Sequence, residues 1–258
     1  MPPIDPTARA LALPAALALA AALALAAACA APEPPPAVEA VAEIPAAPGR
    51  IVGRVVYDDG RGRATPLDMS ADPLCATLHD DPPEHRELLL DEEGHLENVL
   101  VYLFAGVTGG PWDPPAEPKL LDQVGCIFLP RVQALRTGQK MVVRNSDPTL
   151  HNVNGRPVDN PEFNFGQPFQ GMETELVFSH PEKVFRVRCD THPWMAAYLA
   201  VFDHPFYAVT GGDGAFALEN VPPGEYTVRA WHERLGNRDL PVRVASGEPA
   251  ELEILFQP

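Results

Sequence analysis

After residue 30 the sequence contains no long amphipathic helical pattern, which excludes most helical architectures. Short runs of apolar and β-branched residues are separated instead by clusters of Gly, Pro, Asn and Asp, as in strands joined by turns. Residues 184–188 alternate apolar and basic side chains, which is the period of a half-buried strand. The sequence therefore predicts an all-β fold, and 258 residues leave room for one large domain or two small ones.

The charge balance of the chain argues against one class of binding partner. The chain carries 35 acidic and 19 basic residues, which gives a formal net charge of −16. Such an excess of negative charge opposes binding to nucleic acid and favours a soluble, acidic surface. We therefore expect no nucleic-acid partner.

The first 29 residues have the composition of a secretory signal peptide. Residues 10–28 form an Ala and Leu run interrupted only by Pro14, and Cys29 follows. A retained membrane helix is the alternative, but the run lacks flanking charge and is short of the roughly 20 residues that span a bilayer comfortably. We expect residues 1–29 to be a signal peptide, and the protein to be periplasmic or otherwise extracytoplasmic.

The end of this segment also suggests a membrane anchor. Residues 25–29, Leu-Ala-Ala-Ala-Cys, resemble a bacterial lipoprotein cleavage box with alanine where leucine is usual. The resemblance predicts lipidation of Cys29, which would be the only attachment to a membrane; ordinary cleavage near the same alanines is the alternative. Residues 30–49 are rich in Pro, Ala and Glu without periodicity, and we expect a semi-rigid linker there.

Two of the four cysteines, Cys75 and Cys126, belong neither to the signal peptide nor to the metal motif described next. In an oxidising compartment, a disulfide between them is the simplest interpretation. The alternative is a second metal site formed by Cys75, His79 and Cys126.

A metal-binding motif lies between two predicted strands, at residues 184–188 and 198–202. Cys189, His192 and Met195 have the spacing Cys-x2-His-x2-Met, so three donors share one short loop. A thiolate, an imidazole and a thioether suit copper better than magnesium or calcium, which prefer oxygen ligands. His151, in the loop after the predicted strand at residues 140–145, supplies a fourth ligand. Two imidazoles, one thiolate and a weak axial thioether make a type 1, or blue-copper, electron-transfer site.

Residues 145–153 and 189–195 together resemble the cupredoxin family, and the ligand loop is most similar to those of amicyanin and plastocyanin. The Gly138-Gln139 turn and the His151-Asn152-Val153 triplet fit the same family. The resemblance implies a Greek-key β-barrel or sandwich over residues 119–205 that holds one type 1 copper ion. His151, Cys189 and His192 would form a near-trigonal plane, with Met195 as the long axial ligand.

The neighbours of the ligands are predicted to orient them. We expect Asn152 to bridge the two ligand loops beside Cys189. Asp190 stands where relatives usually have Ser or Thr; its carboxylate would accept the amide N–H and lower the reduction potential. Thr191 stands where amicyanin has proline, and its backbone N–H would point at the Cys189 sulfur and raise the potential. These two differences from the relatives have opposite effects on the reduction potential, so the sequence predicts neither a net rise nor a net fall.

Pro193 and Trp194 flank His192. We expect them to form an apolar rim around an exposed edge of the His192 ring, which would make this patch the exit for electrons. The alternative for Trp194 is core packing.

The flanks of the metal domain resemble a second family. Residues 213–216 and 221–228 are similar to the second half of a carboxypeptidase regulatory-like domain, a small Ig- or prealbumin-like β-sandwich. Residues 53–55 and 99–103 resemble its usual opening strands. We expect this sandwich to comprise residues 50–118 plus 206–258, with the cupredoxin domain inserted at 119–205; two tandem domains are the alternative.

These features predict an exported type 1 copper protein, a monomer, that transfers single electrons between redox partner proteins. An enzyme is not expected, because such a closed site lacks an open coordination position and the sequence shows no catalytic triad, paired carboxylates or phosphate loop. The alternatives are a periplasmic copper-binding or delivery protein, and an adhesion or scaffold module with a structural copper site.

Overall fold

Strands form almost all of the secondary structure in the computed structural model, which describes residues 47–58 and 65–257. The only α-helix within these residues is the short α1 (Pro73–Thr77). The all-β prediction is therefore confirmed. The predicted signal peptide, Cys29 and residues 30–46 of the predicted linker lie outside the described residues. No helix in the described part of the chain has the length and apolar character needed to cross a membrane.

The strands between residues 119 and 202 pair only with one another within the described chain, in two sheets. Parallel pairs, β3 (Lys119–Val124) with β6 (Lys140–Asn145) and β5 (Val132–Arg136) with β11 (Ala196–Phe202), are combined with antiparallel pairs, so each sheet is mixed. Buried apolar residues of both sheets, among them Leu121, Val143, Val187 and Leu199, form one core. One sheet has the order β4 (Ile127–Leu129), β3 (Lys119–Val124), β6 (Lys140–Asn145), β9 (Glu173–Val177), and the other β5 (Val132–Arg136), β11 (Ala196–Phe202), β10 (Glu182–Arg188), β7 (His151–Gly155), β8 (Phe163–Gln167).

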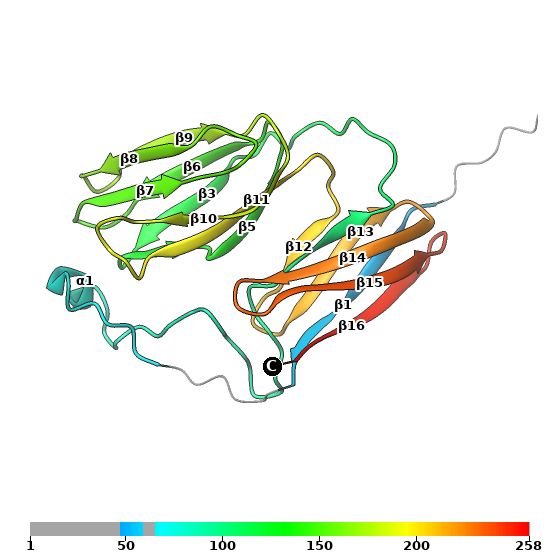
Figure 1. The fold of residues 1–258 in the computed structure, drawn as a ribbon, viewed down its shortest axis with the longest axis horizontal. Helices are drawn as coiled ribbons and strands as arrows, with labels where there is room; N and C mark the ends of the chain where they lie inside the picture. The colour runs from blue at the N-terminus through cyan, green and yellow to red at the C-terminus, as the bar shows by residue number, and fades with distance from the viewer. Residues whose placement is uncertain (1–46, 59–64, 258) are drawn as a thin grey trace, which may run out of the picture. The chain divides into compact units, whose positions relative to one another are not determined.

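Strands that precede residue 119 pair with strands that follow residue 202. β1 (Gly49–Tyr57) lies parallel to β16 (Pro249–Phe256), so the two ends of the described chain are neighbours in one sheet, drawn in blue and red in Figure 1. Gly53 allows this close pairing, since a Cβ atom there would lie 1.8 Å from the carbonyl oxygen of Leu252. One sheet has the order β13 (Ala215–Val221), β1 (Gly49–Tyr57), β16 (Pro249–Phe256), and the other β12 (Tyr207–Val209), β2 (Leu100–Ala105), β14 (Gly224–His232), β15 (Gly236–Val244).

The two sets of strands are joined by a small apolar cluster and an ion pair. Leu100 of β2 packs with Val132 of β5 and Ala200 of β11. Beside them, the guanidinium of Arg131 donates two hydrogen bonds to the carboxylate of Glu233, and both side chains are almost fully buried.

The segment that carries α1 packs against the strands of 119–202. Met69 and Cys75 are buried in their core, although both precede β2 in the chain. Cys75 forms the predicted disulfide with Cys126, and this pairing is confirmed. Both sulfur atoms are consumed by that bond, so the alternative metal site with His79 is excluded. His79 instead contacts the carbonyl oxygen of Gly125 through its Nε2 atom, 2.7 Å away.

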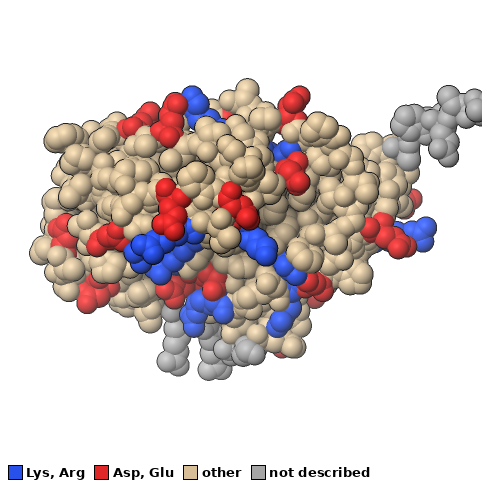
Figure 2. All heavy atoms as spheres, turned by 45° about the horizontal axis from the view of Figure 1, so that its top comes forward, with Lys and Arg blue, Asp and Glu red and all other residues tan. Residues whose placement is uncertain are grey.

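The surface does not gather its negative charge in one place on the face drawn in Figure 2. There, Lys and Arg side chains lie among the Asp and Glu side chains. Among the described residues, exposed charges are paired between β6 and β9, Lys140 with Glu175 and Arg144 with Glu173. Such exposed pairs contribute little stability, so the charge chiefly affects solubility and partner choice.

Candidate metal centre

The fold brings His151, Cys189 and His192 into one buried cluster. His151 begins β7, Cys189 directly follows β10, and His192 lies in the loop before β11. The Nδ1 atoms of the two histidines are 3.0 Å apart, and the Cys189 Sγ is 3.6 Å from the His192 Nδ1. Two ligands that are each roughly 2.0–2.3 Å from an ion such as zinc lie about 3–4 Å apart. The three donor atoms therefore have the spacing of ligands to a single ion.

Met195 closes the loop that carries two of these donors. Its backbone N–H donates to the carbonyl of His192 (2.9 Å), and its carbonyl accepts the N–H of Cys189 (3.3 Å). The Met195 side chain is buried in the same apolar core as Cys189. The two backbone hydrogen bonds hold the backbone of Met195 next to that of Cys189, and burial keeps the thioether away from water.

Each histidine presents its other ring nitrogen to a carboxylate. The His151 Nε2 lies 2.8 Å from Oδ2 of Asp147, and the His192 Nε2 lies 3.1 Å from Oδ2 of Asp72. A carboxylate accepts the Nε2–H, so the neutral form of each imidazole would present its Nδ1 lone pair to an ion in the cluster. Sequence reasoning missed both carboxylates. The i, i+4 spacing of Asp147 and His151 was a usable signal, but nothing in the sequence links Asp72 to a histidine 120 residues away.

The charges in the cluster favour a thiolate. Burial alone would raise the pKa of the Cys189 thiol, but hydrogen bonds from His151 and His192 outweigh it and lower the pKa from 9.0 to about 5. Burial likewise opposes the charged form of both histidines, yet the pKa of each is raised, that of His151 by Asp147 and Cys189 and that of His192 by Cys189 and Asp72. At neutral pH the cysteine is thus ready to act as an anionic ligand.

Asn152 connects the two ligand loops. Its backbone N–H donates to the Cys189 sulfur (3.3 Å), and its Oδ1 accepts the backbone N–H of Asp190 (3.1 Å). The role expected of the Asp190 carboxylate is wrong: it accepts from Asn154 Nδ2 (2.8 Å) and pairs with Arg188 (3.0 Å). Asp190 meets Asn152 through its backbone donor, and its carboxylate bonds to Asn154 and Arg188 instead.

The predicted contact of Thr191 with the sulfur is also absent from the described contacts. Thr191 is exposed, and the backbone N–H that the sulfur accepts is that of Asn152, 3.3 Å away.

The prediction of an exposed His192 edge is wrong. His192 has 0% exposure, because Asp72 covers its Nε2 side and the Cys75–Cys126 disulfide lies beside the ring. Trp194 is half-buried, with its ring 5.2 Å from that of His192 and its Nε1–H donating to the Cys126 carbonyl (3.0 Å). Pro193 is exposed. The two residues therefore do not surround an open imidazole.

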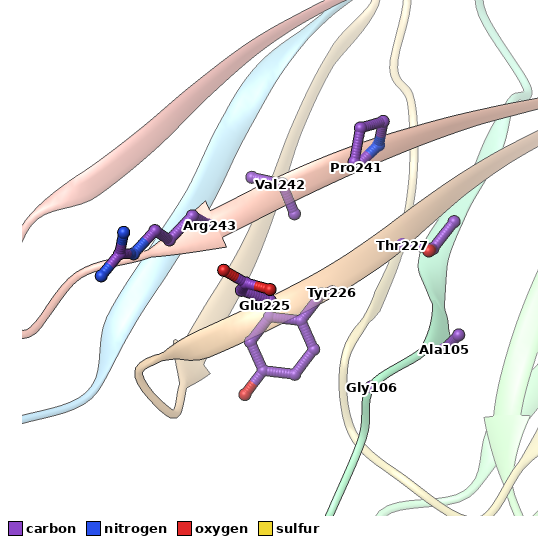
Figure 3. Close-up of a pocket in the computed structure, with 8 residues that line it drawn as sticks. All are labelled: Ala105, Gly106, Glu225, Tyr226, Thr227, Pro241, Val242 and Arg243. Carbon is purple, nitrogen blue, oxygen red and sulfur yellow. The ribbon is translucent and has the colours of Figure 1, made fainter.

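A separate pocket lies on the other set of strands. It has a volume of about 580 Å³ and contains none of the metal-ligand candidates (Figure 3). Its walls come from the end of β2 and from the paired strands β14 and β15: Ala105, Gly106, Glu225, Tyr226, Thr227, Pro241, Val242 and Arg243. This pocket is therefore separate from the cluster around Cys189.

Several solved structures resemble part of the chain. One is the Cu-containing nitrite reductase (NirK) from Thermus scotoductus SA-01, with 22% identity and a TM-score of 0.30 over 38% of this chain and 25% of that chain. A purple cupredoxin from Nitrosopumilus maritimus has 21% identity and a TM-score of 0.27 over 33% of this chain and 99% of its own. A mutant of amicyanin in its Cu(I) form has 16% identity and a TM-score of 0.29 over 33% of this chain and 81% of its own. No protein-family model and no curated protein sequence matches the chain.

Proposed function

We propose that this protein binds one type 1 copper ion and passes single electrons between redox partner proteins. The observation that carries the proposal is the convergence of two imidazole Nδ1 atoms and one thiolate in a buried, preformed cluster. Nitrogen and soft sulfur donors of this kind suit copper, and Met195 adds the weak axial ligand of a blue-copper site.

The ligand side chains and the residues that orient them have different roles at the proposed copper site. Cys189 provides the anionic sulfur, and the N–H of Asn152 stabilises its charge. Asp147 and Asp72 hold the imidazoles of His151 and His192 so that both Nδ1 atoms face the same point. When bound, copper would supply a one-electron couple, and the strands β7, β10 and β11 that contain or flank its ligands would keep the ligand positions similar in both oxidation states.

The protein chemistry favours electron transfer over catalysis. All four predicted ligands are nearly fully buried, so the site leaves little room for a substrate. We propose further that the protein is an exported monomer, tethered through Cys29, and that the strands flanking residues 119–205 form a prealbumin-like sandwich. The sequence features of the N-terminus and of residues 213–228 support these parts of the proposal.

The test is spectroscopic. The chain without residues 1–29, loaded with Cu(II), is expected to show intense visible absorption from thiolate-to-copper charge transfer and a reversible one-electron wave in voltammetry. Cys189→Ser is the matched control and is expected to lose the colour. A colourless wild-type protein would contradict the proposal, and rapid loss of copper to an acceptor would favour delivery over electron transfer.

A further inference from the structure

Residues 67–79, called the cap segment below, lie outside the sheets but are fastened to the metal-binding part of the chain. Leu67 and Leu78 pack against the core that contains Cys189. The disulfide of Cys75 with Cys126 and the contact of His79 with Gly125 add two further attachments to the same turn, between β3 and β4. The cap segment is thus held at several points next to the candidate ligands.

Asp72 uses its two carboxylate oxygens for different tasks. Oδ1 caps α1 by accepting the backbone N–H of Leu74 (3.0 Å), and Oδ2 lies 3.1 Å from the Nε2 of His192. The helix fixes one side of the carboxylate and the imidazole fixes the other. His192 is fully buried, whereas the Asp72 side chain keeps 28% of its surface exposed. Asp72 therefore stands between the imidazole and the solvent.

The disulfide connects the supports of both histidines. Cys75 belongs to the helix that Asp72 caps. Cys126 donates its backbone N–H to Oδ2 of Asp147 (2.7 Å), the same oxygen that lies 2.8 Å from the His151 Nε2. A single covalent link thus joins the two outer carboxylates, one from the cap segment and one from the loop after β6.

We propose that Asp72 is a positioning residue for His192, and that the Cys75–Cys126 disulfide keeps it in place. Asp72 holds Nε2, directs Nδ1 toward Cys189 and shuts the ring edge off from water. This inference rests on the proposed copper function. It means that the metal centre is completed by a segment that ends 40 positions before β3, the first strand of the sheets that carry the candidate ligands.

The key variant is Asp72→Ser. Serine is a good helix N-cap, so α1 keeps its capping group, but the shorter side chain does not reach His192. Loss of such an outer partner typically weakens metal binding by about 10–100-fold. We expect copper affinity to fall by that factor, and the reduction potential to rise because a negative charge beside the ligand is removed. Asp68→Ser is the matched control: it removes the same charge from the same segment, where the carboxylate contacts only the exposed Ser70 N–H.

Asp72→Asn separates position from charge. Its amide oxygen still accepts the Nε2–H, so the affinity is expected to recover most of the loss seen with Asp72→Ser, whereas the potential stays raised. The pair Cys75→Ser with Cys126→Ser is expected to weaken copper binding as Asp72→Ser does. If Asp72→Ser matches Asp68→Ser in both affinity and potential, the positioning role is overturned; wild-type affinity in the double serine variant would overturn the role of the disulfide.

A readout on the copper-free protein keeps the two proposals distinguishable. Nitrogen-15 NMR of the imidazoles is expected to show a slowly exchanging Nε2–H on His192 in the wild type, and to lose it in Asp72→Ser. A wild-type protein that has this proton but binds no copper refutes the copper function and leaves the Asp72 contact standing. Copper binding without a protected proton refutes the positioning role alone.

Discussion

The backbone N–H of Asn152 points at the sulfur of Cys189 across 3.3 Å, which ties β7 to the loop that follows β10. The same residue accepts the N–H of Asp190 through its side chain, so one asparagine fixes both the thiolate and the residue after it. The first prediction concerns this double contact.

Asn152→Ala keeps the backbone donor to the sulfur but removes the bond to Asp190. A typical intramolecular hydrogen bond contributes about 1 kcal/mol, and this one is exposed, so the free energy of unfolding is expected to fall by that amount or less, with faster loss of copper to a chelator. Urea denaturation and stopped-flow chelation measure the two effects. Asn164→Ala is the control: it removes the acceptor of the Asn152 Nδ2 atom and a 3.5 Å contact with the Asp190 carboxylate, but it leaves the bond between Asn152 Oδ1 and the Asp190 N–H in place. Equal effects of the two variants on the copper off-rate would count against the Asn152 bridge.

Breaking the disulfide is expected to lower stability independently of copper. Cys75 and Cys126 are separated by 51 residues in the sequence, and closing a loop of that length reduces the entropy of the unfolded chain by an amount equivalent to about 4 kcal/mol. Copper-free protein with both cysteines changed to serine should unfold at a correspondingly lower urea concentration. An unchanged midpoint would show that the cap segment adds nothing to folding.

The Arg131–Glu233 pair should behave as a buried ion pair, since its side chains are 8% and 5% exposed. Arg131→Met leaves the Glu233 carboxylate buried without its cation, which costs about 3–5 kcal/mol. Adding Glu233→Leu to the same protein should recover most of this loss. A double-mutant cycle by chemical denaturation measures the coupling. Additive losses would mean that the two side chains do not depend on each other.

His232 makes stability depend on pH. It is 1% exposed, and burial lowers its pKa from 6.5 to about 4. Between these values the unfolded chain binds the extra proton, so acidification from pH 6.5 to pH 4 destabilises the fold by roughly 3 kcal/mol. His232→Gln should flatten this part of the stability profile, whereas the exposed His180→Gln should not. The same slope in His232→Gln would assign the pH dependence to other groups.

Cys189 should add a second loss of stability on acidification in the copper-free protein, beginning at higher pH than that of His232. Its pKa is depressed from 9.0 to about 5, so its contribution to stability is complete above pH 9 and is lost as the pH falls through about 5. The raised pKa values of His151 and His192 contribute below 6.5 and are lost as the pH rises through their folded-state values. Ultraviolet titration of the thiolate, with Cys189→Ser as the blank, should give a midpoint near 5. A midpoint near 9 would show that the imidazoles do not stabilise it.

The short runs of alternating apolar and polar residues were sufficient to predict an all-β fold, because this alternation can be recognised within a few consecutive residues. The two remaining cysteines in a chain expected to be exported were sufficient to predict the Cys75–Cys126 pair. Local motifs failed where a contact depends on the direction of a side chain. Asp190 was expected to accept a bond with its carboxylate, and in the structure it donates one with its backbone, a choice that the residue type does not reveal.

The sequence by itself determined which residues are the candidate donors: His151, Cys189, His192 and Met195 are predicted because three lie within seven residues and one follows a marked strand. Only the tertiary structure decided how that set is enclosed. Asp72 lies 120 positions before His192 in the sequence, yet its carboxylate contacts the His192 ring. Helix α1 and the Cys75–Cys126 disulfide hold it there. Spacing along the chain carries no information about such a contact, because packing of the whole core, rather than any local preference, places the cap segment over the imidazole.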